Sequence, residues 1–301
     1  MGSTREPLRV WDALRVQSRI ASAAARVAVL VLVLCGLWAL WEGYRALWVE
    51  TGWTRPFPVN STTMPHLHDI VGALFEPLRE GEPILARYML DAALFTAKEA
   101  AIGFAIGATI GFLLGALIAR FAVLRRGVMP YVVASQTIPI LAIAPIVVVG
   151  LGSVSIAGWT PKDWMRVAVI AAYLTFFPVT VNTVRGLQSA DPAAVELMES
   201  YAAREWSVFW KLRVPAALPY LFSAFKVAAT ASVVGAVIGE LPSSIQSGLG
   251  GWIINFNQYY ALQPENLWAV NLVAALLGIG FFVAVVLVEK LVVHRPPETL
   301  V

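Results

Sequence analysis

Six long stretches of predominantly apolar residues constrain the fold of this chain more than any other feature. Their approximate bounds are residues 27–48, 94–119, 128–151, 165–187, 218–241 and 267–288. A helix that crosses a bilayer needs roughly 20 such residues. The stretches are continuously apolar rather than alternating with a period of two, which favours helices over a β-barrel. We therefore predict an all-α, polytopic membrane protein with about six transmembrane helices.

The composition excludes an ordinary soluble protein. Hydrophobic residues make up 58% of the 301 residues and charged residues 14%, whereas soluble domains contain about 45–50% and about 25%. The single cysteine, Cys35, lies in the first apolar stretch, so no intrachain disulfide can form. That stretch is too long for a secretory signal and carries Trp38, Trp41 and Glu42 where a cleavage site would stand, so we interpret it as a retained anchor.

The distribution of basic residues predicts the orientation in the membrane. Short cytoplasmic loops carry an excess of Lys and Arg. If the N-terminus is inside, the basic residues left on the opposite side are Arg45, Arg55, Arg79, Arg87, Lys162 and Arg166. Both termini are therefore predicted to be cytoplasmic. The sequence pI of about 9.1 reflects this bias and does not indicate nucleic-acid binding.

These expectations divide the chain into five parts. They are a basic cytoplasmic N-terminal segment (1–26), the anchor helix (27–48), an external segment (49–90), a core of five transmembrane helices (91–289) and a cytoplasmic tail (290–301). The external segment is expected to contain a short amphipathic helix near residues 67–78.

The cytoplasmic loop after the fourth stretch, about residues 188–216, has its own helical signals. Asp191 can accept hydrogen bonds from free N–H groups at a helix start, and Pro192 loses none there, so a helix is predicted over residues 192–203. A second amphipathic turn follows, and Pro215 is expected to end it. A hairpin of this kind can simply lie at the lipid interface, anchored by tryptophans.

The same loop carries a spaced motif. Glu196-Leu197-Met198 is followed by three residues, Ala202, nine residues and then Leu212-Arg213-Val214-Pro215. This spacing resembles the EAA loop, E-A-A-x3-G-x9-I-x-L-P, of the permease subunits of bacterial ABC importers. The stretches 214–221, 136–139 and 176–183 are similar to the nitrate, sulfonate and taurine class of these permeases. The resemblance covers about residues 91–289.

The resemblance implies a pore subunit of the bacterial inner membrane that imports a small polar or anionic solute. Its implied partners are a second permease subunit, expected to be identical, an external solute-binding protein and a cytoplasmic ATPase dimer that binds ATP and Mg. The loop would dock on the ATPase, with residues 201–212 as a coupling helix. The implied coupling residues are Glu196, Glu199, Tyr201, Ala202, Ala203, Arg204, Trp206, Phe209, Leu212 and Pro215.

No catalytic residue or cofactor is predicted on this chain. A phosphate-binding loop needs Gly-Lys followed by Ser or Thr, and no Gly-Lys pair occurs. The loop also departs from the family pattern, because Ala202 stands in place of its glycine. Either the turn keeps φ negative there, or a neighbouring residue takes the bend.

Polar residues within the stretches are candidates for the translocation pathway. They are Gln136, Thr137, Asn182, Ser232 and Glu240. Prolines at 139 and 145 can break the third helix and free carbonyls that line a cavity. The alternatives are that Gln136 caps its own broken helix and that Glu240 lies at the outer boundary near Lys or Arg. Lys98 and Glu99 are expected to snorkel or to be paired.

Small residues recur at helical spacing. Gly103, Gly107, Gly111 and Gly115 form a row in the second span, where helices can pack closely. The fifth span also carries a stripe of small residues. The resemblance implies that this span lies near the pore, so the stripe is expected to face a moving interface. Residues 252–260 are expected to form either a short external helix that gates the pore or part of an interfacial aromatic belt.

A metal site is not predicted. His66, His68 and Asp69 crowd one external loop, but the sequence offers no second cluster to complete a coordination shell. Two alternatives to the permease remain, an ion-coupled secondary transporter and a membrane scaffold. The first would predict inverted repeats and charged residues deep in several spans, and neither is evident.

Overall fold

The fold is helical throughout the part of the chain that the structure, a computed structural model, describes: residues 7–55, 58–155, 158–243 and 245–293. Within these ranges the only extended pairing is an isolated bridge between Pro77 and Ile84. The chain divides into two compact units, Met1–Gly72 and Ala73–Val301. Most of the predicted cytoplasmic tail lies outside the described residues.

The first unit contains α1, Pro7–Thr51, and most of α2, Leu67–Ala73. Helix α1 joins the predicted N-terminal segment and anchor into one helix, of which Val27–Thr51 is apolar enough to span a membrane. Helix α2 starts where the amphipathic helix was predicted but ends five residues earlier than residue 78.

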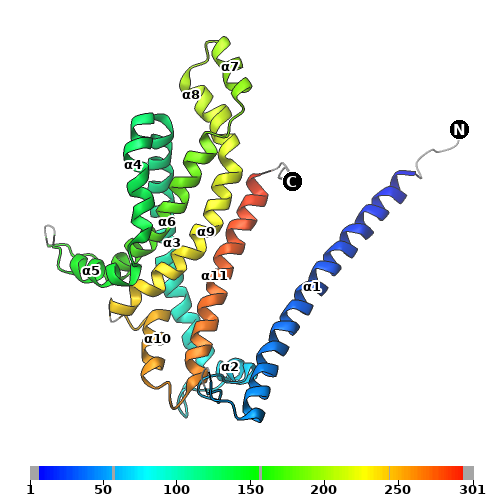
Figure 1. The fold of residues 1–301 in the computed structure, drawn as a ribbon, viewed down its shortest axis with the longest axis vertical. Helices are drawn as coiled ribbons and strands as arrows, with labels where there is room; N and C mark the ends of the chain where they lie inside the picture. Colours follow the sequence, from blue (N-terminus) through cyan, green and yellow to red (C-terminus); the bar gives the residue numbers. More distant parts are fainter. Residues whose placement is uncertain (1–6, 56–57, 156–157, 244, 294–301) are drawn as a thin grey trace. The chain divides into compact units, whose positions relative to one another are not determined.

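The second unit contains the remaining helices (Figure 1). They are α3 (Leu85–Arg120), α4 (Ala122–Ala134), η1 (Ser135–Thr137), α5 (Ile140–Gly152), α6 (Asp163–Leu187), α7 (Pro192–Ser200), α8 (Glu205–Val208), η2 (Phe209–Arg213), α9 (Val214–Glu240), η3 (Leu241–Ser243), α10 (Leu249–Gln258) and α11 (Pro264–Val292). Within this unit α7 and α8 lie at one end and α10 at the other.

The described helices include five that are long and apolar enough to cross a membrane, or six if one bent pair forms a single span. The bent pair is 122–137 and 140–152, which meet at 97°. Ile138 is extended there, with φ −79° and ψ 123°, as a residue before proline prefers. The helix therefore breaks at Pro139 as predicted, whereas Pro145 lies inside α5 without breaking it.

Helix α6 lies between α3 and α9 and forms the centre of the second unit. The glycine row of α3 is buried against α6. A Cβ atom on Gly107 would lie 2.5 Å from the carbonyl oxygen of Ala172, and one on Gly111 would lie 2.6 Å from that of Phe176. Only glycine allows the two backbones to approach so closely.

The small residues of α9 also face inward. Ala228, Ser232 and Ala236 are fully buried, and a Cβ atom on Gly235 would lie 2.8 Å from the Cα of Ala171 in α6. In this conformation the stripe packs on α6 of the same chain. Movement at this interface stays a prediction.

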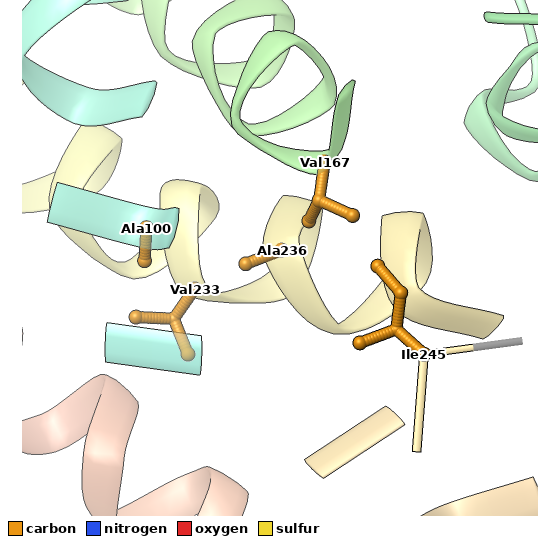
Figure 2. Close-up of a cluster of buried hydrophobic side chains, with 5 residues drawn as sticks. All are labelled: Ala100, Val167, Val233, Ala236 and Ile245. Atoms are coloured by element: carbon orange, nitrogen blue, oxygen red, sulfur yellow. The ribbon is translucent and has the colours of Figure 1, made fainter. Parts of the chain in front are cut away.

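Apolar side chains from three helices meet near one end of this core. Figure 2 shows Ala100 of α3, Val167 of α6, and Val233 and Ala236 of α9 pointing toward one another, with Ile245 from the segment before α10. All five are buried. This cluster fixes the place where the chain leaves α9 and enters α10.

Candidate functional site

The loop between α6 and α9 begins with the predicted helix cap. The side chain of Asp191 accepts a hydrogen bond from the N–H of Ala193 at 3.0 Å, and Pro192 occupies the first helical position. Helix α7 then carries Glu196 and Glu199, both exposed. It ends at Ser200 rather than at the predicted residue 203.

Ala202 lies in the turn after α7, and its backbone conformation differs from both expectations stated above for this position. Its φ is +51°, and it is the only non-glycine residue with positive φ in the described part of the chain. The N–H of Ala202 donates to the carbonyl of Glu199 at 2.8 Å, and the N–H of Ala203 donates to that of Met198 at 3.0 Å. These two bonds define a Schellman motif, whose positive-φ position glycine usually occupies. The alanine itself therefore takes the bend, at the position where the family pattern has glycine.

A separate coupling helix over residues 201–212 does not exist. Residues 201–204 form the turn after α7, and α8 starts at Glu205. From there the helix continues through the π-helical turn η2 into α9. Pro215 does not end it, contrary to our prediction. Pro215 has no N–H to donate. In the π-helical turn before it, the N–H of Val214 donates to the carbonyl of Phe209, five residues earlier. The helix therefore continues past Pro215 without a break.

The loop presents large apolar side chains to its surroundings. Leu197, Tyr201, Trp206 and Trp210 are exposed, and the exposed fraction of Tyr201 is 80%. Such a group of exposed side chains is typical of a surface that contacts a partner or a membrane. Arg204 and Pro215 are also exposed, while Ala203, Phe209 and Leu212 are half-buried.

A pocket of about 350 Å³ lies beside this surface. Its lining residues are Arg120, Glu199, Ala203, Glu205, Trp206, Val208, Phe209 and Arg213. Arg120, at the end of α3, pairs with Glu205 at 2.6 Å and ties the loop to the core. Phe209 packs on the buried cluster of Leu187, Ala217 and Leu221. One side of the loop is thus anchored and the other is open.

The candidate pathway residues fall into two groups. Gln136 and Thr137 are exposed at the break between α4 and α5, where the hydroxyl of Thr137 donates to the carbonyl of Ala134 at 2.8 Å. Asn182 is half-buried and donates to the carbonyl of Pro178 at 2.8 Å. Ser232 and Glu240 are fully buried. Ser232 and Glu240 therefore have no surface open to a solute in this conformation.

Glu240 belongs to a buried polar cluster between α3, α9 and α10. It accepts hydrogen bonds from the hydroxyl of Thr96 at 2.7 Å and from the N–H of Gly250 at 2.6 Å. The oxygen of Thr96 in turn accepts from the N–H of Leu249 at 3.0 Å. The carboxylate is therefore held by a hydroxyl and by the start of α10.

Sequence reasoning missed Glu99 as a member of this region. It is fully buried. Its carboxyl group lies beside that of Glu240, and the two groups interact. One signal was available: Glu99 lies four residues before Gly103, so it continues the buried glycine row. Its neighbour Lys98 instead lies 4.7 Å from the ring centre of Trp164.

The helices and the exposed loop define a class of protein, a polytopic helical membrane protein whose core presents a rigidly mounted loop at one end. Residues 107–295 match the family model described as the binding-protein-dependent transport system inner membrane component. The chain belongs to this family.

Individual relatives agree with this assignment. The chain is 35% identical over 166 residues to the formylaminopyrimidine transport permease protein ThiX of Halalkalibacterium halodurans, covering 55% of this chain and 62% of ThiX. It is 33% identical over 201 residues to the riboflavin transport system permease protein RibX of Chloroflexus aurantiacus, covering 67% and 70%. It is 26% identical over 257 residues to the putative aliphatic sulfonates transport permease protein SsuC of Escherichia coli K12, covering 84% and 89%. The chain thus spans less than two thirds of ThiX.

A solved structure shares the fold. The crystal structure of an amino acid ABC transporter with histidines superposes with a TM-score of 0.52 at 17% identity, covering 69% of this chain and 95% of that one. The predicted all-α polytopic fold and the resemblance to importer permeases are therefore confirmed. The family match over residues 107–295 does not favour a secondary transporter or a scaffold.

Proposed function

We propose that this chain is the pore-forming permease subunit of an ATP-binding-cassette importer, coupled through the loop between α6 and α9 to an ATPase on another chain. The observation that carries the proposal is the exposed apolar surface of Leu197, Tyr201, Trp206 and Trp210 on a loop that continues directly into α9. A surface mounted in this way moves with α9 when a partner pushes on it. ATP and Mg would bind to the partner ATPase.

The loop side is assigned to the cytoplasm, and both termini with it. The loop and the neighbouring helix ends carry the basic residues Arg120, Arg125, Arg126, Arg185, Arg204, Lys211 and Arg213, in agreement with the positive-inside rule. An external binding protein would then deliver the solute at the end where α10 lies. A second, identical permease subunit would complete the pore.

The solute is proposed to be small and polar or anionic. The names of the relatives mention a formylaminopyrimidine, riboflavin and aliphatic sulfonates. The two of these three that exceed 30% identity are named for heterocyclic solutes, so we would test pyrimidines and flavins first. Gln136 and Thr137, exposed at the helix break, are the proposed contacts along the pathway.

Purification of the full chain from its native membrane, followed by mass spectrometry, tests the coupling. Tyr201→Asp and Leu197→Asp introduce charge on the open side of the loop and should abolish copurification of the ATPase. Phe209→Asp is unsuitable, because Phe209 supports the buried cluster of the core. Leu262→Asp is the matched control: its exposed fraction is 80%, as for Tyr201, but it lies between α10 and α11. Equal recovery of the ATPase with Tyr201→Asp and Leu262→Asp would contradict the proposal.

A further inference from the structure

The first unit brings together three side chains that can bind a metal ion, two neighbouring histidines and a glutamate from much earlier in the sequence. Glu42 lies in α1, whereas His66 and His68 lie at the start of α2, 24 and 26 residues further along. Each offers one ligand atom, and these atoms all lie within 4.8 Å of one another. The sequence prediction of no metal site rested on the lack of a further ligand near the histidines, and α1 supplies one.

The segment before α2 is held against α1 by several hydrogen bonds. The indole N–H of Trp41 donates to the carbonyl of Pro65 at 3.1 Å, and Arg45 Nε donates to that of Met64 at 3.0 Å. Glu42 lies between these two donors along α1. It accepts from the N–H of Leu67 at 3.1 Å and from His66 Nδ1 at 2.7 Å. The positions of Glu42 and His66 are therefore fixed before any ion arrives.

His68 completes the group from a more exposed position. Its ring stacks on that of His66 with 4.9 Å between centroids. Its side chain is 75% exposed, compared with 35% for His66 and 19% for Glu42. His68 Nε2 also pairs with the carboxylate of Asp69 at 3.1 Å. A carboxylate on one ring nitrogen orients a histidine whose other nitrogen binds a metal.

We propose that Glu42, His66 and His68 bind a zinc-class divalent transition-metal ion, with Asp69 orienting His68. Two imidazoles and one carboxylate suit Zn²⁺ at about 2.0–2.2 Å from each ligand atom, with a fourth position for water. Ca²⁺ and Mg²⁺ prefer oxygen ligands and fit this group poorly. Tetrahedral ligand atoms at those bond lengths are about 3.3 Å apart, so the group must contract slightly. The exposed ring of His68 can make that movement by side-chain rotation.

Binding moves the imidazole proton of His66 away from the ligand nitrogen. His66 and Glu42 now share a hydrogen bond through a proton on Nδ1. When the metal binds at Nδ1, that N–H bond breaks, and the ring keeps one proton on Nε2, so it binds as a neutral imidazole. The carboxylate of Glu42 exchanges its hydrogen bond to His66 for the metal, and no oxidant or reductant is needed. Because the three ligands lie within the first unit, the proposal is independent of the transport function.

Titration of the full chain with Co²⁺ tests the site. The protein would be purified in detergent with an affinity tag free of histidine, stripped with a chelator and followed by the visible absorption of bound Co²⁺, then by competition with Zn²⁺. The expected result is one saturable ion per chain. His68→Ala should weaken binding at least about tenfold, the scale by which even groups behind a metal ligand matter.

The chain supplies its own matched control, since its third histidine, His294, lies outside the described residues near the C-terminus. His294→Ala should bind Co²⁺ as the parent does. Glu42→Gln should also bind weakly, but Glu42 supports the start of α2, so the exposed His68 gives the cleaner variant. No saturable absorption in the parent chain, or equal affinity in His68→Ala and His294→Ala, would overturn the proposal.

Discussion

The carboxylate of Glu240, the last residue of α9, accepts a hydrogen bond of 2.6 Å from the backbone N–H of Gly250 in α10. A Cβ atom on Gly250 would lie 2.7 Å from the Cβ of Glu240. The two helices therefore approach as closely as this pair of residues permits, and the polar cluster with Thr96 fixes α10 to both α3 and α9.

Thr96→Val should loosen this attachment. The variant keeps the shape of the side chain but removes a hydroxyl that donates to Glu240 and accepts from Leu249. A buried N–H and a carboxylate oxygen lose a partner, which costs about 1–3 kcal/mol. The thermal unfolding midpoint in detergent should fall. Thr109→Val is the control on the same helix, because Thr109 is exposed and bonds only the carbonyl of Ala105; similar midpoints for both variants would argue against the role of Thr96.

Ala202→Gly should stabilise the turn after α7. Alanine at φ +51° carries a steric cost of about 1–2 kcal/mol that glycine avoids. Hydrogen exchange of the Ala203 amide, which bonds Met198, should slow by up to about tenfold, the rate equivalent of 1.4 kcal/mol. Leu197→Gly, which places glycine inside α7, is the control with the opposite expected result: exchange of the Ala203 amide should become faster. Faster exchange in Ala202→Gly would contradict the assignment of strain to this residue.

Gly107→Ala should separate α3 from α6. The added methyl group would lie 2.5 Å from a backbone oxygen and 2.6 Å from the Cβ of Thr175, so a helix must shift. Overpacking of this kind typically costs about 1–3 kcal/mol. Gly278→Ala on α11 is the matched change, since a Cβ atom there meets nothing within 4 Å. Thermal unfolding should separate the two variants, and equal stability would refute close packing at Gly107.

Glu99→Met should raise stability. Burial of a carboxyl group costs free energy, and a second buried carboxyl group beside it adds repulsion between like charges. Methionine fills a similar volume without either cost. The unfolding midpoint should increase relative to the parent chain. Uptake by the reconstituted importer gives a second measurement: a stabler variant with reduced uptake would assign Glu99 to the transport cycle. A lower midpoint would mean that the carboxyl group has a stabilising role.

The sequence alone predicted the helical fold, the break at Pro139 and the cap at Asp191, because each follows from local composition or backbone chemistry. It did not predict the positive φ of Ala202, since alanine rarely adopts it and the Schellman bonds that hold it appear only in three dimensions. The unbroken passage through Pro215 was also missed, because a π-helical turn compensates for the missing N–H. Glu99 was misplaced because a charged residue is normally expected to reach solvent, whereas its register with the glycine row directs it inward.

The passage through Pro215 makes Glu205–Glu240 a single run of 36 residues, about 54 Å long at 1.5 Å per residue. One end carries the exposed tryptophan at 206, and the other carries the carboxylate that holds α10. The helix is continuous from the loop to the contact with α10. If a partner docks on the loop as proposed, a tilt of the loop end is carried along this helix to the end that holds α10, on the opposite face of the membrane.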